Sequence, residues 1–252
     1  MTGDSTNPPS TKGPAASADV FATTHWTLVL AAGANRAPQA DIAMEELCRT
    51  YWYPLYAYIR HQGHSRQDAE DLTQGFFARF LARNYLEGLS SDKGRFRAFL
   101  LAALKHFLAN ERDRAASRKR GGGALPLSLD WKDAASRYQI EPSDQLSPDK
   151  LYDRAWAVTL LERVIQRLRD ESVAEGKAEW FDQLKPFLMM DRTAMPYGQA
   201  AAALGLTHGA ARVTVHRLRK RYRQLLRQEI GRTLSHPAQV KEEMRTLFSA
   251  FN

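Results

Sequence analysis

The chain has 252 residues, 44% of them hydrophobic, and a single cysteine, so it can form folded cores but has no disulfide framework or cysteine-based metal site. Its formal net charge of +8 favours an anionic partner such as nucleic acid or a membrane surface. No apolar run reaches transmembrane length and no signal-peptide pattern begins the chain, so we expect a cytoplasmic protein without membrane insertion.

The first part of the chain is predicted to be a tail followed by a helical domain. Residues 1–22 are mostly Thr, Ser, Pro, Gly and Ala, which bury too little apolar surface to offset the entropy of ordering, so we expect disorder. Residues 41–61 repeat apolar side chains at helical spacing, and Pro54 should kink or divide that helix. The domain is expected over residues 23–120.

Two further helices complete this predicted domain. Ser65 with Asp68 resembles a capping box at the start of the next helix. A third helix begins near Arg95 and ends in a basic stretch that three glycines close. Residues 121–147 then show no sustained period and contain several glycines and prolines, which is typical of a linker between domains.

The second predicted domain covers residues 148–232. Ser147 is a good N-cap for its first helix, with Pro148 at the favoured first position. A shorter helix follows near Trp180. Residues 233–252 repeat apolar side chains at helical spacing and are expected to form a C-terminal amphipathic helix, so the whole chain is predicted to be all-α.

The stretch from Met195 to Ile230 carries the clearest functional pattern. A short apolar helix is followed by Gly205, which tolerates positive φ, and by Thr207, a good N-cap for a second helix. One face of that second helix is apolar: Ala211, Val215, Leu218, Tyr222 and Leu225. Another face is basic: Arg212, His216, Arg219, Arg223 and Arg227. Two helices joined by a tight turn, the second basic, predict a DNA-binding helix-turn-helix.

The basic end of the helix from Arg95 to Arg120 is a second candidate for nucleic-acid binding. Arginine and aromatic planes stack on unpaired bases, and basic groups follow the phosphate backbone. The apolar spacing of the phenylalanines, however, favours a core position for Phe96 and Phe99.

Four stretches in the same order resemble the extracytoplasmic-function (ECF) class of bacterial RNA polymerase sigma factors. They are Ala69–Arg83, Gly94–Arg114, residues 128–138 and Leu206–Leu226. The resemblance covers roughly residues 24–232. The resemblance implies a role for each stretch. The first would be a region-two helix that docks on the clamp helices of the polymerase β′ subunit, and the second would melt and read the minus-ten element. The third would be a connector near the RNA path, and the fourth a recognition helix for the minus-thirty-five element.

The resemblance implies three sets of site residues. The recognition helix would contact promoter DNA through Thr207, His208, Arg212, Thr214, His216, Arg217, Lys220 and Arg221. The minus-ten element would be melted by Lys93, Arg95, Phe96, Phe99, Asn110, Arg114 and Arg118. Core polymerase would be bound by Asp68, Asp71, Leu72, Gln74, Phe77 and Arg79.

The sequence therefore predicts a sigma factor whose partners are core RNA polymerase (β′ clamp helices and β subunit) and promoter DNA. Its regulator would be an anti-sigma factor or its own terminal extensions. No catalytic residue, metal ligand set or cofactor motif stands out, so an enzyme is not expected. Two alternatives stay open. The chain is an autonomous helix-turn-helix regulator, or it is a helical adaptor whose basic helix is only a solvated face.

Overall fold

The computed structural model describes residues 37–81, 94–117, 146–188 and 196–251, and the regular secondary structure of this part of the chain is helical, without a strand. The predicted all-α fold is confirmed for these residues. The predicted disordered tail, nearly all of the predicted linker, and the candidate residues Lys93 and Arg118 lie outside the described residues. None of the described helices is long and apolar enough to cross a membrane.

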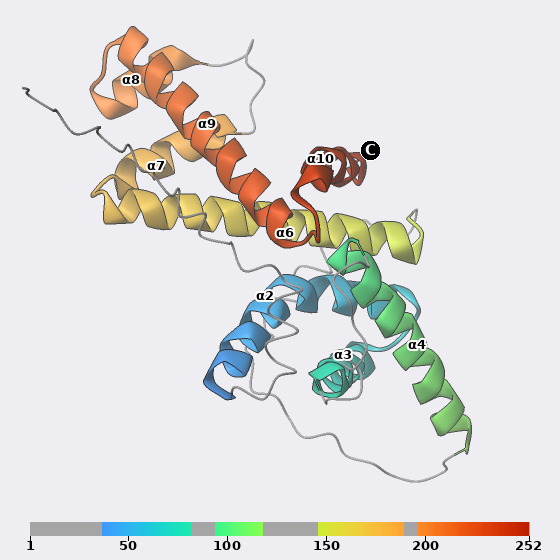
Figure 1. The fold of residues 1–252 in the computed structure, drawn as a ribbon. Coiled ribbons are helices and arrows are strands. Elements are labelled where there is room, and N and C mark those ends of the chain that lie inside the picture. The colour runs from blue at the N-terminus through green and yellow to red at the C-terminus, as the bar shows by residue number, and fades with distance from the viewer. Residues whose placement is uncertain (1–36, 82–93, 118–145, 189–195, 252) are drawn as a thin grey trace, which may run out of the picture.

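Three helices form the first group: α2 (Ala37–His61), α3 (Arg66–Leu81) and α4 (Phe96–Ser117). Helix α2 continues through Pro54 rather than dividing there, and Figure 1 shows that it is bent. At the start of α3 the Ser65 hydroxyl accepts a hydrogen bond from the Asp68 N–H at 3.1 Å and donates one to its carboxylate at 2.6 Å. The predicted cap is therefore present, although the Asp68 carboxylate binds the hydroxyl and not the backbone.

Helix α6 (Pro148–Ala174) is the central element of the fold. Its start follows the predicted chemistry, because the Ser147 hydroxyl accepts a hydrogen bond from the Lys150 N–H and Pro148 occupies the first turn. Its 27 residues make a rod of about 40 Å at 1.5 Å per residue. Figure 1 shows α2, α3 and α4 on one side of this rod and the remaining helices on the other.

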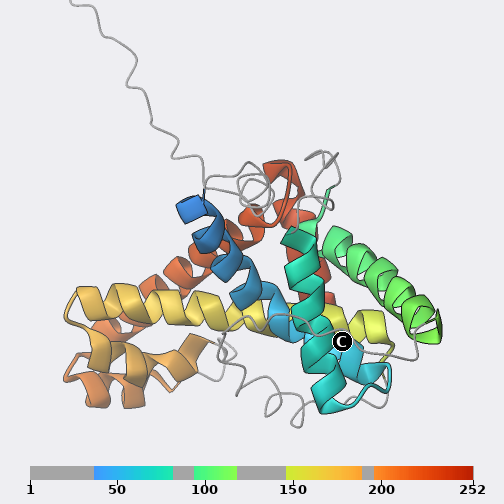
Figure 2. The same ribbon diagram turned by 90° about the horizontal axis from the view of Figure 1, so that it is seen from below.

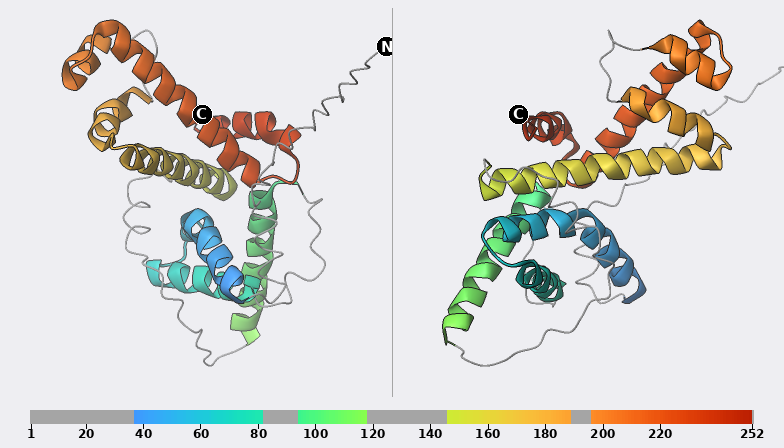
Figure 3. Two further views of the ribbon diagram at one scale, coloured as in Figure 1. Left: turned by 60° about the vertical axis from the view of Figure 1, so that its left-hand side comes forward. Right: turned by 180° about the vertical axis from the view of Figure 1, so that it is seen from behind.

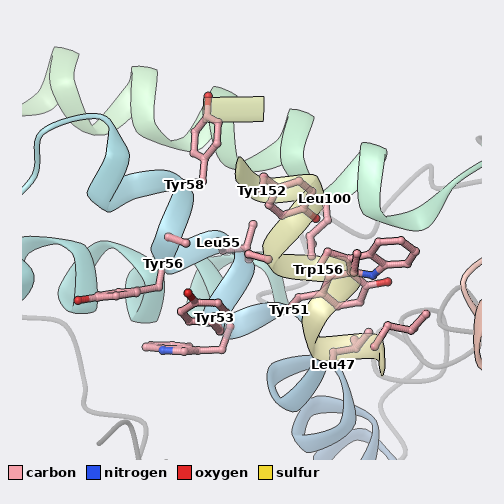
Figure 4. Close-up of a cluster of buried hydrophobic side chains, with 14 of the residues drawn as sticks. Leu47, Tyr51, Tyr53, Leu55, Tyr56, Tyr58, Leu100, Tyr152 and Trp156 are labelled. Atoms are coloured by element: carbon pink, nitrogen blue, oxygen red, sulfur yellow. The ribbon is translucent and has the colours of Figure 1, made fainter. Parts of the chain in front are cut away.

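The largest core runs between α2 and α6. Helix α2 crosses α6 (Figure 2), and the side chains between them include Tyr51, Tyr152 and Trp156, each at most 1% exposed (Figure 4). Residues 50–59 of α2 are buried on every face, since α3 and α4 cover the sides that α6 does not. Helices on either side of the predicted linker thus share one continuous core.

A second, smaller core lies among the helices that follow α6. It is built from α7 (Ala178–Leu184), a 3-10 turn η3 (Lys185–Leu188), α8 (Tyr197–Leu204) and α9 (His208–Arg232). The small side chains of Ala200, Ala201 and Ala211 let α8 and α9 approach closely over Leu184 and Phe187. The C-terminal half of α9 leaves this small core and packs on α6 through residues of the main core.

The chain ends in a 3-10 turn η4 (Pro237–Gln239) and helix α10 (Val240–Ser249). Leu234 pairs with Arg95 in an antiparallel bridge just before η4, so the segment after α9 returns to the first residues of α4. Figure 3 shows α10 beside the end of α9 and above the start of α4. A helix is thus present in the predicted C-terminal segment, and its Leu247 side chain is buried against the rest of the fold.

Candidate nucleic-acid interface

The connection between α8 and α9 is a three-residue turn whose geometry depends on Gly205. Gly205 has φ 63° and ψ 31°, and the next residue donates its N–H to the Ala201 carbonyl at 2.9 Å. This is the left-handed ending that glycine makes at least cost. The Thr207 hydroxyl then caps α9 by accepting a hydrogen bond from the Ala210 N–H at 3.3 Å. The turn therefore fixes the direction in which α9 leaves α8.

Replacing Gly205 with Ala should lower the free energy of unfolding by about 1 kcal/mol, because a Cβ at positive φ is strained. No atom lies within 4 Å of the added Cβ, so the cost is in the backbone alone. Gly209, inside the first turn of α9, offers a matched control, since Ala there should be neutral or stabilising. Urea unfolding of the two variants checks the difference, and equal effects would contradict a turn that depends on the positive φ of Gly205.

The solvent face of α9 is a basic stripe: Arg212, His216, Arg217, Lys220, Arg223 and Arg227, all of them exposed. No acidic residue occurs between Arg212 and Arg227. The stripe extends over about 22 Å of helix, at 1.5 Å per residue. An exposed, unbroken cationic helix face of this length matches the negative backbone of a nucleic acid.

The N-terminal half of the basic stripe also borders a hollow of about 480 Å³. Its lining consists of Tyr197, Arg212, Val213, Val215, His216, Arg217 and Arg219. Val213 is 49% exposed between the charged side chains, which leaves an apolar contact point in the stripe. Such a surface combines the donors that contact phosphates and base edges with an apolar group that can contact a thymine methyl.

Arg221, which the resemblance places among the DNA contacts, lies on a different side of α9. Its guanidinium donates to both carboxylate oxygens of Glu171 on α6, at 2.8 and 2.6 Å. Arg219 likewise turns inward and donates to the Phe187 carbonyl at 2.9 Å. Because the bidentate pair holds Arg221 against α6, this residue belongs to the packing of α9 and not to the basic stripe.

The other DNA contacts predicted on α9 also divide into side chains that bind the protein itself and side chains that face solvent. Thr207 uses its hydroxyl as the cap, and the Thr214 hydroxyl donates to the Ala210 carbonyl at 2.9 Å. His208 is exposed at the start of α9, with its ring edge-on to Tyr197. Among the eight predicted contacts, the structure gathers Arg212, His216, Arg217 and Lys220 on one exposed face.

The Arg221–Glu171 pair should make stability depend on pH. The hydrogen bond from Arg221 holds the pKa of Glu171 below its ordinary value of 4.5. A depressed folded-state pKa contributes stability above the ordinary pKa, and that contribution is lost as pH falls through the folded pKa. The stability difference between wild type and Arg221→Gln should therefore shrink when urea unfolding is repeated below pH 4.5. Arg223→Gln, an exposed cation on the basic stripe, should show no such change.

The predicted minus-ten residues are dispersed along α4. Phe96 is fully buried, with its ring 5.3 Å from that of Tyr51, and Phe99 is half-buried against Phe80 and Phe96. A base cannot reach Phe96 in this arrangement. The core position that the spacing favoured is thus confirmed for Phe96.

The polar members of that set that the structure describes are Arg95, Asn110 and Arg114, and each has a protein partner. Arg95 forms ion pairs with Glu242 and Glu243 of α10, at 2.8 Å each. Asn110 lies on an outer face of α4 within 3.3 Å of the His106 ring nitrogen. Arg114 is half exposed and pairs with Glu111 at 3.0 Å.

The predicted polymerase-binding residues of α3 fall on two faces. Asp68 and Asp71 are exposed, and Leu72 and Gln74 are half-buried beside them. Phe77 is buried and stacks on Trp52, with ring centroids 5.8 Å apart. The side chain of Arg79 reaches Glu111 of α4 at 3.3 Å. The acidic start of α3 is therefore open to a partner, whereas Phe77 supports the core.

Sequence reasoning missed a polar cluster where α2, α6 and α9 meet. It lines a hollow of about 570 Å³ and consists of Glu46, Arg163, Arg167, Gln228, Glu229 and Arg232. Arg163 pairs with Glu46 across the α2–α6 contact, and Arg167 donates to Glu229 at 2.8 Å. No local sequence pattern predicts such a cluster, because its members come from three helices that are far apart in the sequence.

Two further features bear on the chemistry of the described residues. Burial raises the pKa of the Cys48 thiol to about 12, so this side chain stays protonated at neutral pH. No group of three or more His, Cys, Asp or Glu side chains is arranged to hold a metal ion in the described part of the chain.

Comparison of the sequence and the fold with family models, with curated proteins and with solved structures gives no match in any of the three.

Proposed function

We propose that this protein is a sigma factor, the subunit that gives bacterial RNA polymerase its promoter specificity. The observation that carries the proposal is the basic stripe of α9, because it is exposed, unbroken by acidic side chains, and presented beyond the turn at Gly205. In this proposal α8 and α9 are a helix-turn-helix. Arg212, His216 and Lys220 enter the major groove, which is wide enough to admit a helix.

The first group of helices would have a different role in the proposal. The exposed carboxylates at the start of α3 would contact core polymerase, and α4 would face the unpaired strand of the minus-ten element. The order of the stretches that resemble ECF sigma factors supports this assignment. The burial of Phe96 excludes its ring from contact with a base, which leaves the half-buried Phe99 and the polar residues for this role.

Transcription in vitro tests the proposal directly. Bacterial core RNA polymerase is supplied with a library of promoter fragments, with and without the full chain. We expect specific start sites only when the chain is present, and the shared upstream sequences would then define the elements that it reads. The variant Arg212→Gln/Lys220→Gln, which removes two cations of the basic stripe, should start transcription far less often.

The other results of this experiment distinguish the alternatives. Binding of duplex DNA without binding of core polymerase would replace the proposal with an autonomous helix-turn-helix regulator. Binding of neither would leave a helical adaptor. In that case neutralising the basic stripe would change no interaction of the protein.

A further inference from the structure

The C-terminal helix α10 occupies a cationic site at the start of α4. Glu242 and Glu243 of α10 both pair with Arg95, at 2.8 Å each, and Glu243 also accepts from Arg97 at 2.6 Å. Arg97 has a further carboxylate partner in Asp153 of α6 and lies 4.9 Å over the ring of Trp156. Two neighbouring carboxylates of one helix thus bind two arginines that lie about 146 positions earlier in the chain.

The two arginines differ in how much they depend on α10. Arg97 is 5% exposed and keeps Asp153 as a partner whether or not α10 is present. The Arg95 side chain is 32% exposed, and within the described part of the chain its ion pairs are both with α10. Removal of α10 would therefore leave Arg97 inside the fold and release the guanidinium of Arg95.

The docking of α10 is specific. The Glu243 side chain is fully buried although α10 is only ten residues long, and a carboxylate is buried in this way only when it is paired. Backbone contacts align the segment, because the Phe96 N–H donates to the Thr233 carbonyl at 3.1 Å and the Ser235 hydroxyl donates to the Gly94 carbonyl. Leu247 adds a buried apolar contact.

We propose that α10 is an intramolecular competitor of single-stranded DNA for Arg95. Carboxylates and phosphodiester oxygens are the same kind of partner for a guanidinium. Glu242 and Glu243 occupy the Nη2 and Nε atoms of Arg95, so a phosphate competes with α10 for these two donors. The bound form of α10 is then the closed state, and DNA binds the state in which α10 has left. This inference rests on the proposed function, in which the start of α4 faces the unpaired strand.

The first experiment measures affinity for DNA with the full chain. A short fluorescein-labelled single-stranded DNA is titrated with wild type and with the double variant Glu242→Gln/Glu243→Gln, and anisotropy is recorded. Loss of the charge-assisted bonds to Arg95 shifts the equilibrium toward the open state, and apparent affinity rises with the fraction that is open. We expect binding to tighten about tenfold.

The matched control removes the same two negative charges elsewhere. Glu45 and Glu70 are carboxylates of exposed pairs with Arg49 and Arg66 on their own helices. The double variant Glu45→Gln/Glu70→Gln should bind DNA as the wild type does, apart from a small effect of net charge. Adding Arg95→Gln to the α10 variant should abolish the gain.

A second measurement needs no variant at α10 and keeps the inference testable if that variant folds poorly. Hydrogen exchange of residues 240–249 is followed in the wild type, with and without saturating single-stranded DNA. We expect exchange in α10 to accelerate when DNA is bound. Unchanged protection of α10 with DNA bound would overturn the inference, as would an equal gain in the charge-matched control or no gain in the α10 variant.

These results separate the inference from the proposed function. If the wild type directs promoter-specific transcription but the α10 variant binds single-stranded DNA no better than the charge-matched control, the sigma-factor assignment stands. The proposal that α10 competes with DNA is then rejected. A tenfold gain in binding that Arg95→Gln abolishes, without promoter-specific transcription, would retain the competitor and reject the sigma factor.

Discussion

Under the proposed function, replacing Arg212 and Lys220 with Gln together should weaken binding of the polymerase-bound protein to duplex promoter DNA about a hundredfold. Each side chain is an exposed cation of the basic stripe, and a hydrogen bond to a charged group contributes about 1.5–3 kcal/mol. The slope of log affinity against log salt should also fall by about 0.9 for each phosphate that the variant no longer neutralises. Filter binding or anisotropy over a series of salt concentrations gives both quantities.

Two controls separate this effect from the change in net charge. Arg49→Gln with Arg66→Gln removes two exposed cations that lie on α2 and α3, and it should leave the salt slope unchanged. Arg221→Gln removes a cation of α9 itself, but one that faces Glu171, so it should lower stability without altering the slope. A slope that falls equally in all three variants would rule out a localised contact by the basic stripe.

Replacing Arg97 with Met should destabilise the fold strongly, by more than the loss of an exposed ion pair or of a favourable turn residue. Arg97 is 5% exposed, and its removal leaves the fully buried Glu243 carboxylate with one fewer cation. Breaking a buried ion pair by removing one partner costs about 3–5 kcal/mol. In a chain of this size that corresponds to a fall in melting temperature on the order of 10 °C. Calorimetry or urea unfolding measures it.

A double-mutant cycle shows whether the loss comes from the unpaired charge. Arg97→Met combined with Glu243→Leu removes both charges, so it should be less destabilised than the sum of the two single variants. Arg49→Met, which breaks an exposed pair within one helix, should leave the melting temperature close to that of the wild type. Strict additivity in the cycle would indicate that Arg97 contributes only packing.

The features that the sequence predicted well are those that depend on neighbouring residues. The hydroxyls of Ser147 and Thr207 cap the helices that follow them, and Gly205 adopts the positive φ that a tight turn needs. Each of these depends on chemistry within about four residues. The exposed cations of α9 were predictable for the same reason, because the helical period alone separates them from the apolar stripe.

The features that could not be predicted depend on which helices meet. Tyr53 and Tyr58 lie off the apolar stripe of α2 and are nevertheless buried, because α3, α4 and α6 surround that helix. Arg221 and Lys220 are neighbouring basic residues that the sequence does not distinguish. Only the position of Glu171 on α6 shows that Arg221 packs against α6. The ion pairs of Arg95 and Arg97 with α10 join residues too distant for any spacing rule.

The pairing of Arg95 with the C-terminal segment has a consequence for folding during synthesis. Glu242 lies 147 positions after Arg95 in the chain. At roughly 5–20 residues per second, a ribosome completes α10 about 7–30 s after it has made the start of α4. Helices α2, α3 and α4 are therefore made while Arg95 is still uncovered, and the nascent chain can close this site only after α10 has been synthesised.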